Sequence, residues 1–237
     1  MKLICYLSLG SPNIPHSIDI ANHYVASGCD TIEVDFPAED PYLDSPYIQS
    51  RMKEALSACN DYQKYMDAIV QIKKNQPKAS FIVLIYEKTI KTIGIDRFID
   101  FCQQNHLYDI ICVGNEYPEV REYLMKSKLK VSTFIRYHLP EEDILVAKEA
   151  NGFIYLQAKP SDQMHQEYQS LKTIIPYLRK RSISNPIYCG VGVSTPEDVK
   201  MVKDAGGDGV FIGSTVLKLH HDLPELKTMI QALKSQT

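Results

Sequence analysis

The sequence predicts a single (β/α)8 barrel, or TIM barrel, that spans residues 1–237 as one domain. Three observations favour this fold class. Short β-branched segments alternate with longer amphipathic ones, about eight such units fit in the chain, and no linker, charge block or low-complexity segment interrupts them. Strict alternation indicates a parallel sheet, and about eight units favour closure into a barrel over an open, doubly wound sheet.

The expected strands are short runs rich in β-branched and aromatic residues. They cover residues 3–8, 31–36, 81–86, 109–113, 130–135, 152–157, 186–189 and 209–212. The expected helices show apolar residues at helical spacing, and Pro140 and Pro196 suit the start of a helix. They cover residues 15–28, 47–59, 62–74, 95–105, 119–126, 141–150, 166–181, 196–205 and 223–233.

Charge and hydropathy exclude several classes of protein. The net charge is −3, and the lysines are spread among acids, so we expect no nucleic-acid and no membrane partner. No apolar run approaches the ~20 residues of a membrane helix. The first six residues are too short and too strand-like for a signal peptide, so we expect a cytoplasmic protein.

The cysteines and histidines suggest no metal site. The six cysteines form no CxxC pair, and Cys5, Cys112 and Cys189 fall in expected strands, where a thiol is usually a small, reduced, buried hydrophobe. His220 and His221 have no acidic or cysteine partner at ligand spacing, so we interpret them as an exposed helix feature. We expect neither a metal nor a cofactor.

Two carboxylates mark the second expected strand. Period-two alternation sends Ile32, Val34 and Phe36 toward the helices, and Glu33 and Asp35 into the barrel. An interior carboxylate is costly unless it is paired, neutralised or functional. A buried structural ion pair or a different register is the alternative. The acidic, proline-rich loop at residues 37–46 follows, at the end of the barrel where active sites form.

Two glycine motifs follow the last two expected strands. Residues 190–198 read GVGVSTPED and residues 206–214 read GGDGVFIGS, each leading from a strand into a helix. Glycines let backbone N–H groups approach an anion, and barrel enzymes commonly hold a substrate phosphate at these two loops. Either motif alone could be an ordinary tight turn, but the two together predict a phosphate site.

The chain resembles the tryptophan synthase α subunit family through nearly its whole length. The resemblance rests on LSLGSP at residues 7–12, IEVDFPAEDPYLDSPYIQ at residues 32–49 and the two glycine motifs. It implies a lyase that cleaves indole-3-glycerol phosphate to indole and glyceraldehyde 3-phosphate in tryptophan biosynthesis. Members usually pass the indole to a β subunit that depends on pyridoxal phosphate.

The same resemblance assigns roles to individual residues. Glu33 matches the general acid/base, and Asp44 matches the aspartate that accepts the indole N–H. The matching substrate-binding positions are Tyr6, Leu84, Tyr86 and Tyr155 around the indole ring, and Gly192, Gly213 and Ser214 around the phosphate. The ring positions could equally be core packing.

Several positions depart from the family pattern. Asp35 stands where the family has glycine, and it could either raise the pKa of Glu33 or crowd the site. Residues 159–164, KPSDQM, replace a mobile Gly-Val-Thr-Gly lid, and Lys159 could supply charge to an anion there. Residues 114–118, GNEYP, replace the usual Asp-x-Pro. Because lid closure completes such sites, two alternatives stay open: a catalytically weak partner or regulator of a β-type subunit, and a barrel lyase or isomerase for another phosphorylated substrate.

Overall fold

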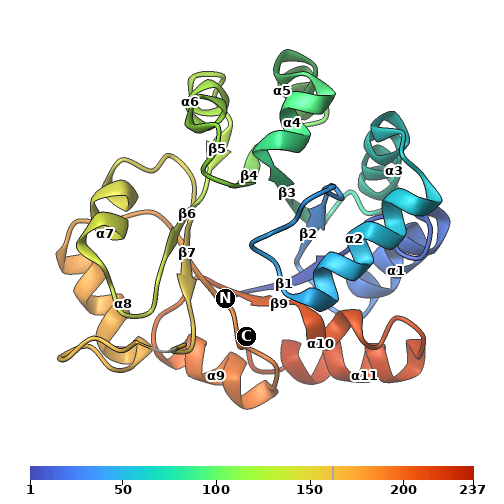
Figure 1. Cartoon of the computed structure of the whole chain (residues 1–237). Coiled ribbons are helices and arrows are strands. Elements are labelled where there is room, and N and C mark those ends of the chain that lie inside the picture. The colour runs from blue at the N-terminus through green and yellow to red at the C-terminus, as the bar shows by residue number, and fades with distance from the viewer. Residues whose placement is uncertain (162) are drawn as a thin grey trace.

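A computed structural model describes residues 1–161 and 163–237. All of its strands are parallel and belong to one sheet, in the order β5-β4-β3-β2-β1-β9-β8-β7-β6. Figure 1 shows the helices as a ring outside the strands. The predicted barrel class is confirmed.

The strands lie close to their predicted positions. They are β1 (Lys2–Leu7), β2 (Thr31–Asp35), β3 (Ser80–Tyr86), β4 (Asp109–Val113), β5 (Lys130–Val131), β6 (Thr133–Ile135), β7 (Ile154–Gln157), β8 (Ile187–Gly190) and β9 (Gly209–Ile212).

The helices follow the strands along the chain. They are α1 (Ile14–Ala26), α2 (Pro46–Ala58), α3 (Tyr62–Asn75), α4 (Glu87–Ile93), α5 (Ile95–Gln104), α6 (Pro118–Lys126), α7 (Glu141–Lys148), α8 (Leu171–Lys180), α9 (Pro196–Asp204), α10 (Ser214–Leu217) and α11 (Leu223–Lys234).

The barrel closes where the fifth predicted strand divides into β5 and β6. The Ser132 amide donates to the carbonyl of Ile110 on one side at 2.9 Å, and the next amide, of Thr133, donates to the carbonyl of Phe153 on the other side at 3.2 Å. Arg121 donates to the Ser132 carbonyl and, at 2.9 Å, to the Thr133 hydroxyl. One short segment therefore changes its hydrogen-bonding partner from β4 to β7 and joins the two edges.

Apolar residues form two clusters, one on the outer face of the sheet and one on its inner face. Ile32, Val34 and Phe36 belong to the large outer core between strands and helices, as the period-two pattern predicts. A smaller inner cluster fills the barrel itself, with Ile4, Ile82, Ile111, Phe153 and Phe211. The strands therefore bury both faces, which is usual for parallel sheets.

Local sequence explains where α2 and α9 begin. The Ser45 and Thr195 side chains cap α2 and α9, each with proline next, and Asp198 completes a capping box with Thr195. Two helical expectations are wrong. α8 begins at Leu171 rather than at residue 166, and α4 follows β3 directly where no helix was predicted.

The cysteines agree with the prediction in large part. All six are free; Cys5 and Cys189 are fully buried, whereas Cys112 is only partly buried. Within the described part of the chain, no helix is long and apolar enough to cross a bilayer.

His220 is buried, so the prediction of an exposed histidine is wrong there. Arg51 can only donate, so its 3.3 Å contact makes Nδ1 of His220 the acceptor. Nε2 then donates to the Tyr24 hydroxyl at 2.7 Å, and that hydroxyl donates to the Tyr6 carbonyl at 2.9 Å. Burial and the charge of Arg51 lower the pKa of His220 to about 3, so the ring is neutral. The chain of bonds ties the turn after α10 to α1 and β1.

We expect Tyr24→Phe to lower the free energy of unfolding by about 1–3 kcal/mol, because it leaves the buried donor of His220 and the Tyr6 carbonyl unpaired. Urea denaturation measures the change. Tyr123→Phe is the matched control, since that side chain is 55 % exposed; equal effects of the two variants would contradict the expectation.

Candidate active site

Glu33 and Asp35 lie inside the barrel because they occupy alternate positions of β2. The register pairs Glu33 with Tyr6 on β1 and with Ile82 on β3. Both carboxyls are enclosed, Glu33 being 4 % exposed and Asp35 0 %. Neither belongs to an ion pair among the described residues, so the alternative of a structural ion pair is excluded there.

The environment of Glu33 favours its protonated form. Burial, followed by the negative charges of Asp35 and Asp44, raises its pKa from 4.5 to about 8. A carboxyl that titrates near neutrality can donate a proton and take one back, which is what a general acid/base requires.

Asp35 differs from Glu33 in having two hydrogen-bond donors. The Tyr6 hydroxyl donates to Oδ2 at 2.5 Å, and the Leu9 amide donates to Oδ1 at 2.6 Å. Burial raises the pKa of Asp35 to about 7, and these two bonds oppose the rise. These two bonds tie Asp35 to β1 and to the loop that follows it.

Asp44 is fixed at the end of the acidic loop by the start of α2. It directly precedes the capping residue Ser45, and the Gln49 side chain donates to its carbonyl at 2.8 Å. The Tyr86 hydroxyl donates to Oδ2 of Asp44 at 2.7 Å. Burial raises the pKa of this carboxyl, and the bond from Tyr86 opposes the rise. Tyr86, predicted as a ring contact, thus also anchors Asp44.

The aromatic residues of the interior lie around Tyr155. Its ring stacks on Phe211 with centroids 4.3 Å apart, and burial followed by the charges of Glu33 and Asp44 raises its pKa. Gly190 makes room for that ring, because a Cβ there would lie 2.5 Å from it. Leu84 packs against the inner cluster that includes Phe211. Phe211 was not predicted as a site residue; it lies within the second glycine motif, and its alternation along β9 could have indicated it.

The two glycine motifs meet at neighbouring strand ends. β8 and β9 pair side by side, and Gly192 and Gly213 follow them. Gly192 has φ +85°, which favours glycine, and a Cβ on Gly213 would meet nothing within 4 Å. Ser214 is exposed. This end of the barrel therefore offers backbone groups and a hydroxyl beside open space.

Lys159 lies beside Gly192, at the end of β7. A Cβ on Gly192 would contact the aliphatic part of Lys159 at 3.2 Å, and the Lys159 ammonium lies 2.7 Å from Oδ1 of Asp198. Its charge is thus placed at the glycine motif but is paired with Asp198, which completes the capping box of α9.

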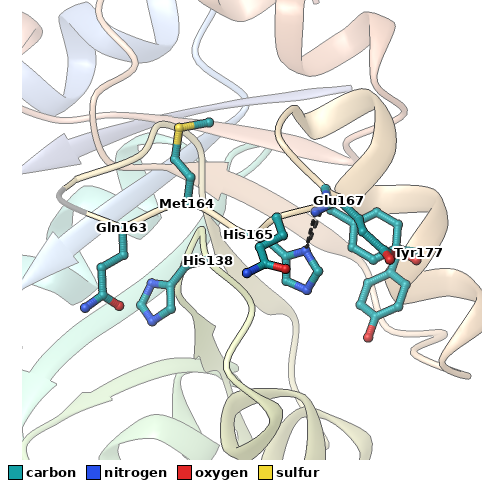
Figure 2. A pocket seen from close by; sticks show the side chains of 8 residues that line it. His138, Gln163, Met164, His165, Glu167 and Tyr177 are labelled. Carbon is teal, nitrogen blue, oxygen red and sulfur yellow. Dashed lines mark hydrogen bonds between the residues drawn. The ribbon is translucent and has the colours of Figure 1, made fainter.

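A cavity of about 590 Å³ lies apart from these residues (Figure 2). Figure 2 shows His138, Met164 and His165 among the side chains lining it, and His165 accepts a bond from the Glu167 amide at 3.0 Å. None of the predicted site residues lines it. Within residues 1–161 and 163–237, no group of three or more His, Cys, Asp or Glu side chains is arranged to hold a metal.

Glu87 is a further buried carboxylate that the sequence interpretation missed. It begins α4 and accepts from the amides of Glu116 and Tyr117, the latter at 2.8 Å. These amides belong to the loop that replaces the family's Asp-x-Pro, so an acid from the preceding unit holds that loop. The acidic residue at the end of β3 was the available signal.

Comparison with known proteins bears on the whole chain. The family model described as tryptophan synthase alpha chain matches residues 1–237. The chain belongs to this family.

Sequence relatives and solved structures agree in coverage. The tryptophan synthase alpha chain of Buchnera aphidicola subsp. Baizongia pistaciae is 27 % identical over 244 residues, covering 98 % of this chain and 90 % of the relative. A structure from Aquifex aeolicus VF5 has a TM-score of 0.86 at 23 % identity, covering 99 % of this chain and 92 % of that one. Tryptophan synthase from M. tuberculosis has a TM-score of 0.81 at 23 % identity, with the same coverage.

The family's reaction is the lyase reaction expected from the sequence, the cleavage of indole-3-glycerol phosphate in tryptophan biosynthesis. The low identity fits a divergent member.

We expect Glu33→Gln to stabilise the protein increasingly as pH rises from 5 to 8. Below about pH 4.5 both folded and unfolded chains hold the Glu33 proton, but between 4.5 and about 8 only the folded chain does. The folded protein then binds more protons than the unfolded chain, so stability falls with rising pH, by at most about 1.4 kcal/mol per pH unit. The variant removes this dependence. Melting temperatures across the range measure it, with the exposed Glu39→Gln as control; a difference from wild type that stays constant with pH would contradict it.

Proposed function

We propose that this barrel cleaves indole-3-glycerol phosphate to indole and glyceraldehyde 3-phosphate, with Glu33 as general acid/base and Asp44 as the partner of the indole N–H. One observation carries the proposal: an enclosed carboxyl with a pKa near neutrality faces the charge of an anchored second carboxyl inside a barrel of this family.

The proton transfers require both protonation states of Glu33. Protonated Glu33 donates to C3 of the indole ring and produces the indolenine cation. The resulting carboxylate then accepts the proton of the glycerol hydroxyl next to the bond that breaks. The bond's electron pair returns to the ring, and indole and the aldehyde are released with Glu33 protonated again. A raised pKa makes the first step possible at neutral pH.

Asp44 stabilises the positive charge that develops on the indole nitrogen. It must be ionised for this, and the bond from Tyr86 favours the ionised form and fixes the carboxylate's position. Tyr6, Leu84 and Tyr155 would surround the ring, and Gly192, Gly213 and Ser214 would hold the phosphate. The placement of the two glycine motifs at paired strands supports this division.

We also propose that a β-type subunit consumes the indole and that the reaction takes place in the cytoplasm. The M. tuberculosis structure is of a tryptophan synthase, and six free thiols suit a reducing compartment.

Indole release by the purified protein tests the proposed reaction. We expect wild type to release indole from indole-3-glycerol phosphate. Glu33→Gln and Asp44→Asn should each lower kcat by about 10²–10⁴-fold, the usual effect of losing a positioned acid or base. Glu39→Gln, on the exposed part of the same loop, should keep the wild-type rate.

No indole from wild type, even with a β subunit present, would contradict the proposal. A faster β-subunit reaction without indole release would identify the regulator instead, and binding of glycerol phosphate without indole analogues would identify a different phosphorylated substrate.

We expect Gly213→Ala to weaken binding of indole-3-propanol phosphate by tenfold or more, because its methyl group enters the space proposed for phosphate. Binding of indole-3-propanol, which lacks the phosphate, should be unchanged. Calorimetric titration of both ligands, with a melting curve, separates this result from unfolding. Equal losses for both ligands would contradict the phosphate assignment.

A further inference from the structure

Asp35 is an enclosed carboxyl that the mechanism above does not use. It lies two residues after Glu33 on the same face of β2 and has no exposed surface. The family pattern has glycine at this position. An acid in such a place is costly. Its presence therefore calls for a physical reason.

The two partners of Asp35 select its ionised form. An amide N–H can only donate, so the Leu9 bond requires an acceptor at Oδ1. Burial followed by the charge of Asp35 raises the pKa of Tyr6, so the Tyr6 hydroxyl keeps its proton and donates to Oδ2. The positive charge of Arg51 favours the same form. A carboxyl with a donor at each oxygen holds negative charge more readily than one without.

Glu33 has no comparable partner. It accepts no hydrogen bond from any described residue, and it is almost fully enclosed. When two carboxyls share a low-dielectric space, ionisation of one opposes ionisation of the other. Since Asp35 has the donors, the negative charge belongs on Asp35 and the proton on Glu33.

We propose that Asp35 is a positioning residue for proton transfer: held as a carboxylate between Tyr6 and the Leu9 amide, it keeps Glu33 protonated and ready to donate. This inference rests on the proposed role of Glu33 and adds to it a device particular to this chain.

Other groups facing the pair define what the variants can show. Tyr6 faces it from β1, Tyr155 from β7, Tyr65 from α3, Arg51 from α2 and Asp44 from the acidic loop, whereas Cys5 lies on the outer side of β1. Of these, Asp44 also disfavours charge on Glu33, and it remains in every variant below. Removing the charge of Asp35 should therefore lower the pKa of Glu33 only in part, because the charge of Asp44 still raises it.

Asp35→Asn is the direct test, because asparagine keeps the shape and an acceptor for the Leu9 amide while removing the charge. We expect the upper limb of the pH profile of kcat/KM for indole release to move at least one unit toward acid. The variant should thus lose about tenfold or more at pH 9 and far less at pH 6. Tyr6→Phe removes one donor from Asp35 and should shift the limb in the same direction.

A merely structural role for Asp35 predicts something else. It would lower the rate by one factor at every pH, and an unmoved limb or a uniform loss would overturn the proposal. Asp35→Gly, the family's residue at this position, provides a second way of removing the charge if the asparagine variant folds poorly.

Infrared titration tests the proposal without any substrate, so a failure of the lyase assignment remains distinguishable. We expect a protonated-carboxyl band at neutral pH that disappears in Glu33→Gln and whose titration midpoint falls by at least one unit in Asp35→Asn. A wild-type protein lacking that band, or a midpoint that does not move, would refute the inference whether or not indole is released.

Discussion

The enclosure of Glu33 inside a closed ring of strands is the constraint on which the rest of the site depends. Closure comes from one segment, Ser132–Thr133, which bonds Ile110 of β4 with one amide and Phe153, directly before β7, with the next. That ring removes the carboxyl from water. With it, desolvation is the largest cause of the raised pKa. Enclosure by the barrel thus raises the pKa of Glu33 enough for it to act as an acid at neutral pH. The same burial lowers the free energy of unfolding at that pH.

The three interior acids differ in the number of hydrogen-bond donors that they have. Asp44 has one donor, Asp35 has two, and Glu33 accepts from none of the described residues. The donors favour the ionised forms of Asp35 and Asp44, whereas Glu33, which has none in the described part of the chain, favours its protonated form. Tyr6 connects the arrangement to the outer shell: its hydroxyl binds Asp35, while its carbonyl receives the chain of bonds from Arg51 through His220 and Tyr24. His220, in the turn after α10, is thus linked to the carboxyl pair through Tyr24 and Tyr6 without touching it.

Sequence patterns predicted what depends on local periodicity and missed what depends on distant partners. Alternation along β2 was sufficient to send Glu33 and Asp35 inward, and β4 and β9 have the predicted bounds. Periodicity cannot tell which neighbouring strand an amide bonds, so the division of the fifth strand was not predictable. His220 looked exposed because its polarity is visible in the sequence and its partner Tyr24, 196 residues away, is not. The bond between Tyr6 and Asp35 was missed for the same reason, although each residue was noted separately.

The loop after β7 shows how the same reasoning extends to the phosphate end. The family's lid brings a glycine, whereas this chain has Lys159 beside Gly192, with its ammonium paired to Asp198. Asp198 also accepts from the Ser194 and Thr195 amides at the start of α9, so it already has donors without the lysine. The pair is 40 % exposed on the lysine side, where an ion pair is worth little. A dianionic phosphate arriving beside Gly192 would compete for that ammonium at small cost, because Asp198 keeps its backbone bonds. In place of the family's glycine-containing lid, this chain thus has a lysine ammonium beside the first glycine motif.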